Sequence, residues 1–174
     1  ADWLAPQAIE LRAYDLIGFG ERPDRGFWRG SEALRVQLAA RIAEARAARP
    51  GLPLFVLGDS MGAAVTVLGT TGTDAPTVDG IVLVAPAVWG GRSLSPIYRS
   101  VLRFLNDVAP GWRVSGQGLG IQASDNIAAL IARGRDPLYL RQPIIQMVAG
   151  VVQLMDDVQP LAEFAGVERL PGTR

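Results

Sequence analysis

The 174-residue sequence contains no lysine, no cysteine and no histidine, so all 17 of its basic residues are arginines. Without lysine, catalysis through a protein Schiff base is excluded. Without cysteine, the chain has no thiol nucleophile, no disulfide framework and no zinc–thiolate site. The missing histidine removes the commonest general base of enzymes. These three absences narrow the possible chemistry before any motif is considered.

The sequence also lacks an excess of charge of either sign and lacks a long apolar run. Its 17 basic and 17 acidic residues cancel, which argues against a nucleic-acid partner. The longest strongly apolar run, residues 143–155, is shorter than the about 20 residues of a membrane-spanning helix. No signal peptide opens the chain. The compartment is not fixed: a cytoplasmic location is favoured, and membrane-associated or exported locations stay open because the native start is expected to be missing.

The first half of the chain alternates between patterns of strands and helices. Residues 9–14 alternate apolar and polar side chains, which predicts a strand. Ser31 is a suitable N-cap for the amphipathic helix that follows it. Pro53–Leu57 and Gly80–Val84 are apolar runs typical of strands buried on both faces of a parallel sheet. A small, apolar helix is expected between these two strands. The order predicts a parallel α/β sheet with flanking helices in a single domain.

From Pro86 onward the alternation stops and only helices are predicted. Ser95 and the proline after it mark a helix start. Ser124 is the expected cap of a short helix, and Pro143 is expected to start a helix that is apolar on nearly every side. We read this stretch as a helical insertion that lies on the sheet. The expected division is a core over residues 1–85, a helical cap over 86–165 and a return toward the core over 166–174.

The strongest motif is Gly58-Asp59-Ser60-Met61-Gly62, which has the form G-x-S-x-G between a predicted buried strand and a predicted helix. In that setting Ser60 is expected on a strained, tight turn, with its hydroxyl projecting from the sheet edge as a nucleophile. Gly58 and Gly62 allow neighbouring backbone to approach the turn. The N–H of Met61, at the helix start, is the candidate donor to an oxyanion. The alternative is an ordinary Gly/Ser turn between a strand and a helix.

The segment P-L-F-V-L-G-D-S-M-G-A-A-V at residues 53–65 resembles the nucleophile elbow of the monoacylglycerol lipase and lysophospholipase group of α/β-hydrolases, also called serine aminopeptidase-like hydrolases. Residues 14–23 (Y-D-L-I-G-F-G-E-R-P) and 81–87 (I-V-L-V-A-P-A) resemble further segments of that family, and D-P-L-Y at 136–139 resembles a cap motif. The resemblance covers nearly the whole chain. It departs at Ile17 and Ala63, where the family usually has Arg and Gly. It implies an α/β-hydrolase core with a helical cap insertion.

The resemblance also implies that the chain is a central fragment, truncated at both ends. The family's second oxyanion donor comes from a histidine-glycine motif that would precede Ala1. Its catalytic acid and histidine would follow the last residue, Arg174. The triad histidine and acid are therefore expected outside this chain, which alone should be inactive. Asp15 matches a family aspartate that closes a strand, and it is not assigned as the triad acid.

The implied function of the intact protein is hydrolysis of carboxylic esters through an acyl-enzyme on Ser60, with monoacylglycerols or lysophospholipids as favoured substrates. No metal or organic cofactor is implied, and the expected partner is a small ester or lipid. A rival hypothesis is a non-catalytic α/β-hydrolase-like domain that binds a lipid or a protein, which the lack of histidine favours. A third keeps the enzyme but changes the reaction to small acyl esters or acyl transfer.

Other features have more ordinary interpretations. Gly18-Phe19-Gly20 could open a dinucleotide fingerprint, but Pro23 occupies the place of the third glycine. Asp156 and Asp157 are adjacent on a helix, which favours a solvated helix end over a shared site. Asp59 is expected to be an exposed loop acid. The cap's apolar residues are mostly expected to be core, and an acyl-chain pocket or a membrane-touching lid is the functional alternative; the residues concerned are Trp89, Tyr98, Phe104, Trp112 and 143–155.

Overall fold

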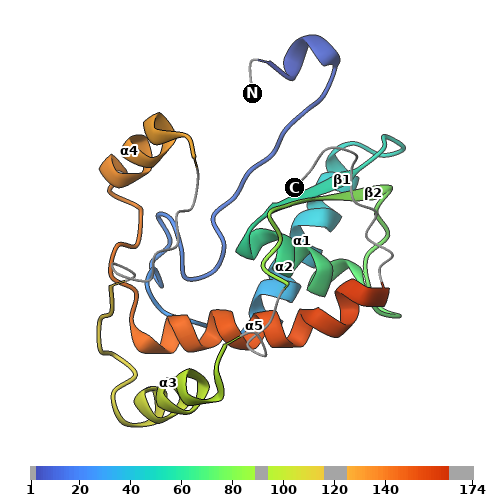
Figure 1. Ribbon diagram of the computed structural model, residues 1–174. Coiled ribbons are helices and arrows are strands. Elements are labelled where there is room, and N and C mark those ends of the chain that lie inside the picture. The colour runs from blue at the N-terminus through green and yellow to red at the C-terminus, as the bar shows by residue number, and fades with distance from the viewer. Residues whose placement is uncertain (1–2, 89–93, 116–124, 165–174) are drawn as a thin grey trace.

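The computed structural model describes residues 3–88, 94–115 and 125–164. Their elements, in chain order (Figure 1), are η1 (Ala5–Gln7), α1 (Ser31–Ala48), β1 (Phe55–Asp59), α2 (Met61–Thr70), β2 (Gly80–Val84), α3 (Pro96–Val108), α4 (Ile127–Arg135) and α5 (Ile145–Phe164). The expected return segment, residues 166–174, lies outside this part of the chain.

The two strands form a parallel pair joined by α2, as the sequence predicts. The register runs from Phe55 beside Gly80 to Asp59 beside Val84. Helix α2 packs against both strands, and α5 packs on α2. Figure 1 shows α3 on the opposite side of α5 from α2, so the layers follow the order sheet, α2, α5, α3. Because the two strands are parallel, their carboxyl ends lie at the same edge of the sheet. The predicted elbow lies at this edge, between the end of β1 and the start of α2.

The core lies on the helical side of the sheet. Helix α1 contributes Leu34, Leu38 and Ile42 at helical spacing, all at most 4% exposed. Helix α5 contributes Leu154 and Val158, which are fully buried in the same cluster. The remaining members come from α2 and the turn after β2: Ala64, Val65, Val67 and Ala87. The apolar helix predicted near Pro143 thus packs on the core, although it begins at Ile145.

The prediction that both strands are buried on both faces is wrong for the described residues. Phe55 and Leu57 on β1 are each 61% exposed, and Val82 and Val84 on β2 are also exposed. Alternate residues of a strand point to opposite faces, and the intervening Val56 and Leu83 pack against the core. One apolar face of the sheet is therefore uncovered by the part of the chain that the structure describes. A continuous apolar run in the sequence does not tell whether a strand is covered on both faces of the sheet or on one face only.

The strand predicted at residues 9–14 is not formed. The segment is extended and exposed, and no strand among the described residues pairs with it. Its side chains are engaged instead, with Arg12 and Arg49 paired to Glu10 and Arg41 over the ring of Tyr14. Alternating apolar and polar side chains are not enough to form a strand, because the backbone must also hydrogen-bond to a neighbouring strand.

Two of the predicted helix caps need correction. Ser31 is the first residue of α1 rather than its cap, which is Gly30, and the Ser31 hydroxyl donates to Asp157 at 3.1 Å. Helix α4 is capped by Asn126, whose Oδ1 accepts from the Ala129 N–H, and Ser124 lies outside the described residues. The predicted cap Ser95 is confirmed, because its hydroxyl oxygen accepts from the N–H of Tyr98.

Helix α3 differs from the expectation that cap residues are mostly core. It has no buried residue, and Tyr98 and Phe104 are 70% and 63% exposed. Trp112, just after the helix, is also exposed, while Trp89 lies outside the described residues. Within the described part of the chain, no helix has the length and apolar character to cross a membrane.

Candidate active site

Ser60 occupies the single position between the end of β1 and the start of α2. Its backbone angles, φ 51° and ψ −113°, are rare for a residue other than glycine, and Ser60 is exposed. A serine held in such a strained turn between the carboxyl end of a parallel strand and the start of a helix has the backbone form that the G-x-S-x-G motif predicts. The local chain therefore folds as a strand–turn–helix with serine at its tip.

Both backbone polar groups of Ser60 are hydrogen-bonded to the end of β2 and the turn that follows it. The Ser60 N–H donates to the carbonyl of Val84 at 2.9 Å. The Ser60 carbonyl accepts from the N–H of Ala87 at 3.1 Å, and it also accepts from Ala63 and Ala64 in the first turn of α2. The turn is thus tied to the neighbouring strand as well as to its own helix.

The two glycines of the motif differ in their surroundings. A Cβ on Gly58 would lie 2.5 Å from the Gly62 carbonyl oxygen and 2.6 Å from backbone atoms of Ala63, so β1 and α2 approach too closely there for any side chain. For Gly62, apart from its chain neighbours and the backbone of its own helix, no atom among the described residues lies within 4 Å of the corresponding position. The close backbone approach expected at both glycines is therefore present at Gly58.

Met61 is the first residue of α2. The first N–H groups of a helix have no intrahelical acceptor, and they lie at the positive end of the helix dipole. The Met61 N–H therefore stays the candidate oxyanion donor, at the start of α2 and next to Ser60. Asp59, the last residue of β1, is exposed as expected, although it lies in the strand and not in a loop.

The loop after residue 14 is built around its own polar contacts. The Asp15 carboxylate accepts the N–H of Glu21 at 2.9 Å, and a Cβ on Gly20 would overlap that carboxylate. Gln37, in α1, donates its side-chain amide to the Asp15 carbonyl and accepts the N–H of Ile17. Gly20 thus leaves room for a side chain of this chain, which explains the glycine without a dinucleotide. The sequence patterns do not single out Gln37, which is a polar residue among the buried positions of α1.

The adjacent acids of α5 face different partners. Asp156 accepts from Arg99 of α3 at 3.1 Å, whereas Asp157 accepts from Ser31 and Gln153. Neither the described part of α5 nor the rest of the described chain holds a group of three acidic, cysteine or histidine residues that could bind a metal ion. The two acids fasten α5 to α3 on one side and to α1 on the other.

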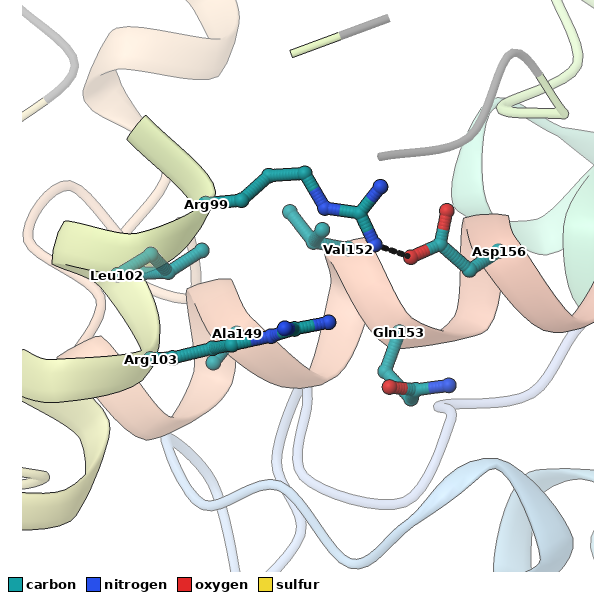
Figure 2. A pocket seen from close by; sticks show the side chains of 7 residues that line it. All are labelled: Arg99, Leu102, Arg103, Ala149, Val152, Gln153 and Asp156. Atoms are coloured by element: carbon teal, nitrogen blue, oxygen red, sulfur yellow. Dashed lines mark hydrogen bonds and ion pairs between the residues drawn. The ribbon is translucent and has the colours of Figure 1, made fainter. Parts of the chain in front are cut away.

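A small pocket lies between α3 and α5 (Figure 2). Arg99 and Arg103 extend from α3 toward α5, and Arg99 reaches Asp156. The pocket holds about 50 Å³, well below the several hundred Å³ of ordinary ligand sites. Arg99, Leu102 and Arg103 thus lie on the side of α3 that faces α5. Most apolar residues of α3 lie on its other side; those more than 45% exposed are Ile97, Tyr98, Val101, Phe104 and Val108.

Similarity to solved structures confirms the fold expected from the sequence. A monoacylglycerol lipase from Paleococcus ferrophilus superposes with a TM-score of 0.65 at 22% identity, over 87% of this chain and 56% of its own. A soluble variant of monoglyceride lipase from Saccharomyces cerevisiae gives 0.57 at 18% identity, over 81% and 48%. A thermostable carboxyl esterase from Bacillus coagulans gives 0.59 at 19% identity, over 82% and 53%. The chain has the α/β-hydrolase fold and spans about half the length of these proteins.

The sequence profile of the family described as serine aminopeptidase, S33, matches residues 1–168. The chain therefore belongs to this family of α/β-hydrolases, as its motifs suggested. Among curated protein sequences none matches the chain.

Proposed function

We propose that the natural protein containing this chain hydrolyses carboxylic esters with Ser60 as its nucleophile. The single observation that carries the proposal is the conformation of Ser60, exposed at φ 51° between a parallel strand and a helix start. Strain of this kind in a non-glycine residue persists only where the surrounding structure imposes it, and it concentrates at functional sites. Membership of a hydrolase family supports the same conclusion.

In the proposed reaction the Ser60 hydroxyl oxygen attacks the ester carbonyl while its proton passes to a base. The Met61 N–H donates to the oxyanion that forms, the alcohol leaves with a proton, and an acyl-enzyme remains on Ser60. Water then attacks the acyl-enzyme carbonyl, the bond to the Ser60 oxygen breaks, and the carboxylic acid leaves while the serine regains its proton. Since the sequence contains no histidine, a base of the usual kind comes from residues outside these 174, as do the triad acid and the second oxyanion donor.

We further propose a lipid ester, of the monoacylglycerol or lysophospholipid type, as the substrate. Two of the structurally similar proteins are monoacylglycerol or monoglyceride lipases by name. The outward apolar side of α3 supports a role at a lipid surface, because single exposed apolar residues are common but a contiguous stripe is not. In this proposal residues 86–165 form a cap over the core of residues 1–85, and α3 is the cap's contact with the membrane surface.

Labelling with a fluorophosphonate probe tests the nucleophile. The natural protein should react covalently, with the label on the peptide that contains Ser60, and Ser60→Ala should abolish the reaction. Ser100→Ala is the matched control, since Ser100 is an exposed serine within α3. Labelling that survives Ser60→Ala would assign the nucleophile elsewhere. Complete absence of labelling in the wild type would favour a lipid- or protein-binding domain without catalysis.

A substrate comparison tests the proposed chemistry. Monoacylglycerol and lysophospholipid of one acyl length should be hydrolysed faster than a short-chain ester or an amino-acid anilide. Preference for the short ester would retain the enzyme and reject the lipid substrate. Cleavage of the anilide alone would indicate peptidase chemistry instead.

A further inference from the structure

Ala85 shares an unusual backbone property with Ser60. Its φ is 42°, and the described residues include one further non-glycine residue with positive φ, Ala8. Ser60 directly follows β1 and Ala85 directly follows β2, so the two strained residues lie at neighbouring strand ends of the same sheet edge. Ala85 is exposed, so packing of its side chain does not account for the strain.

The hydrogen bonds show what the turn at Ala85 accomplishes. Val84, just before it, accepts the N–H of Ser60, and Ala87, two residues after it, donates to the carbonyl of Ser60. A chain that continued straight from β2 would carry residue 87 away from Ser60. The left-handed turn at Ala85 brings the buried Ala87 back, so that one short segment holds both backbone groups of the serine.

Because of the geometry of the peptide bond, the hydrogen bonds to the Ser60 carbonyl also orient the proposed oxyanion donor, the N–H of Met61. The Ser60 carbonyl and the Met61 N–H belong to one planar, trans peptide unit, so they point in opposite directions. An amide that holds the carbonyl, as Ala87 does together with Ala63 and Ala64 of α2, therefore also holds the direction of the N–H. A hydrogen bond accepted by the carbonyl also polarises the same unit, which strengthens its N–H as a donor.

We propose that Ala85 is a positioning residue, whose left-handed turn aims the Met61 N–H through the bond from Ala87 to the Ser60 carbonyl. The catalytic consequence rests on the proposed function, whereas the structural role of the turn does not. Ala85 itself touches no substrate in this proposal. A β-branched residue resists positive φ, while glycine adopts it freely, so the turn can be weakened and restored at one position.

The test compares three variants of the natural protein: Ala85→Val, Ala85→Gly and Ala8→Val. Ala8 has a φ of 56° at the end of η1, so Ala8→Val introduces the same backbone conflict away from the elbow. Ala85→Val should slow fluorophosphonate labelling about tenfold or more, because a small misplacement of catalytic groups has a large effect on rate. Ala85→Gly should stay within about threefold of the wild type. Ala8→Val should label at the wild-type rate.

Two further readouts separate positioning from a general loss of stability. With an ester substrate, Ala85→Val should lower kcat and leave KM nearly unchanged, because the donor acts mainly on the transition state. Amide hydrogen exchange of residues 60–64 should be faster in Ala85→Val than in Ala8→Val or Ala85→Gly. Replacing Ala87 by lactic acid turns its N–H into an ester oxygen, which removes the bond to the Ser60 carbonyl and should reproduce the kinetic defect. The same change weakens the Pro86 carbonyl, which accepts from the N–H of Val88, so this variant supports the proposal only together with the defect of Ala85→Val.

Normal labelling and normal exchange in Ala85→Val would overturn the proposal, as would a slow Ala85→Gly variant. If the wild-type protein does not label at all, the proposed function fails, and the exchange measurement still decides the role of the turn. In that case, faster exchange in Ala85→Val alone supports the positioning role, and equal exchange in all variants rejects it.

Discussion

Helices α2 and α3 have similar lengths but opposite relations to the rest of the molecule. Helix α2 buries six of its ten residues, most of them small, between the sheet and α5. Helix α3 has 13 residues and buries none, although its apolar residues recur on one side. Arg99, Leu102 and Arg103 of α3 line the small pocket between this helix and α5. The apolar side of an amphipathic helix therefore does not always face its own chain.

The comparison shows that α2 and α3 are held in place by different kinds of contact. Around α2, close packing of small residues holds the strand–turn–helix in one arrangement. At α3 the contact with α5 includes a partly buried ion pair, Arg99 with Asp156, and the helix itself has no buried residue. Rigidity is thus concentrated where the strained serine needs support, and the outer helix is free to present its apolar side to another surface.

Truncation of the core should have the largest effect. Leu154→Ala, on the side of α5 that packs in the core, should lower the free energy of unfolding by about 3 kcal/mol, because it leaves a cavity in a fully buried site. Phe104→Ala removes a larger side chain from α3 and should cost less than about 0.5 kcal/mol. Urea unfolding of the natural protein measures both. Equal losses would show that α3 is as firmly packed as the core.

A methyl group at the elbow should have the next largest effect. Gly58→Ala should destabilise the protein by about 2 kcal/mol and strongly reduce labelling of Ser60, because β1 and α2 must move apart. Gly62→Ala is the matched control, and it should leave the thermal midpoint nearly unchanged. A tolerated Gly58→Ala would mean that the tight approach of strand and helix is not required.

Much of this organisation could be predicted from the sequence, and the failures have physical causes. The range Gly80–Val84, the serine turn and the buried stripe of α1 follow from local pattern, because each depends on residues close in sequence. The missing strand at residues 9–14 and the exposed strand face depend on partners that no local pattern specifies. The turn at Ala85 was missed because alanine gives no sign of positive φ.

The outward side of α3 should bind lipid without supporting the fold. The double variant Ile97→Ser/Phe104→Ser should reduce sedimentation with phosphatidylcholine vesicles about tenfold or more, since it removes two large apolar groups from the contact. Its unfolding midpoint in urea should match that of the wild type. Val36→Ser, at an exposed apolar residue of α1, is the control and should bind vesicles normally. Unchanged binding of the double variant would reject α3 as the membrane contact.

The smallest effect should come from a polar tie beside β2. Asp79 accepts the N–H of Leu54 and pairs with Arg46 of α1, both at 2.7 Å. The bond from Leu54, followed by the contact with Arg46, lowers the pKa of the Asp79 carboxyl from its ordinary value of 3.8. A lowered folded-state pKa stabilises the fold above that ordinary value, and the contribution disappears as the pH falls below it.

The expected result is therefore a difference between wild type and Asp79→Asn that depends on pH. Thermal midpoints should favour the wild type slightly at about pH 7 and converge toward about pH 3, while carboxylates common to both proteins cancel. Arg46→Gln should retain part of the dependence, because the Leu54 N–H still donates to the carboxylate. A difference that grows as the pH falls would have the opposite sign and would show that Asp79 is not stabilised in its charged form. A small effect of Asp79→Asn together with a large effect of Leu154→Ala would show that packing contributes more to the stability of the fold than this ion pair does.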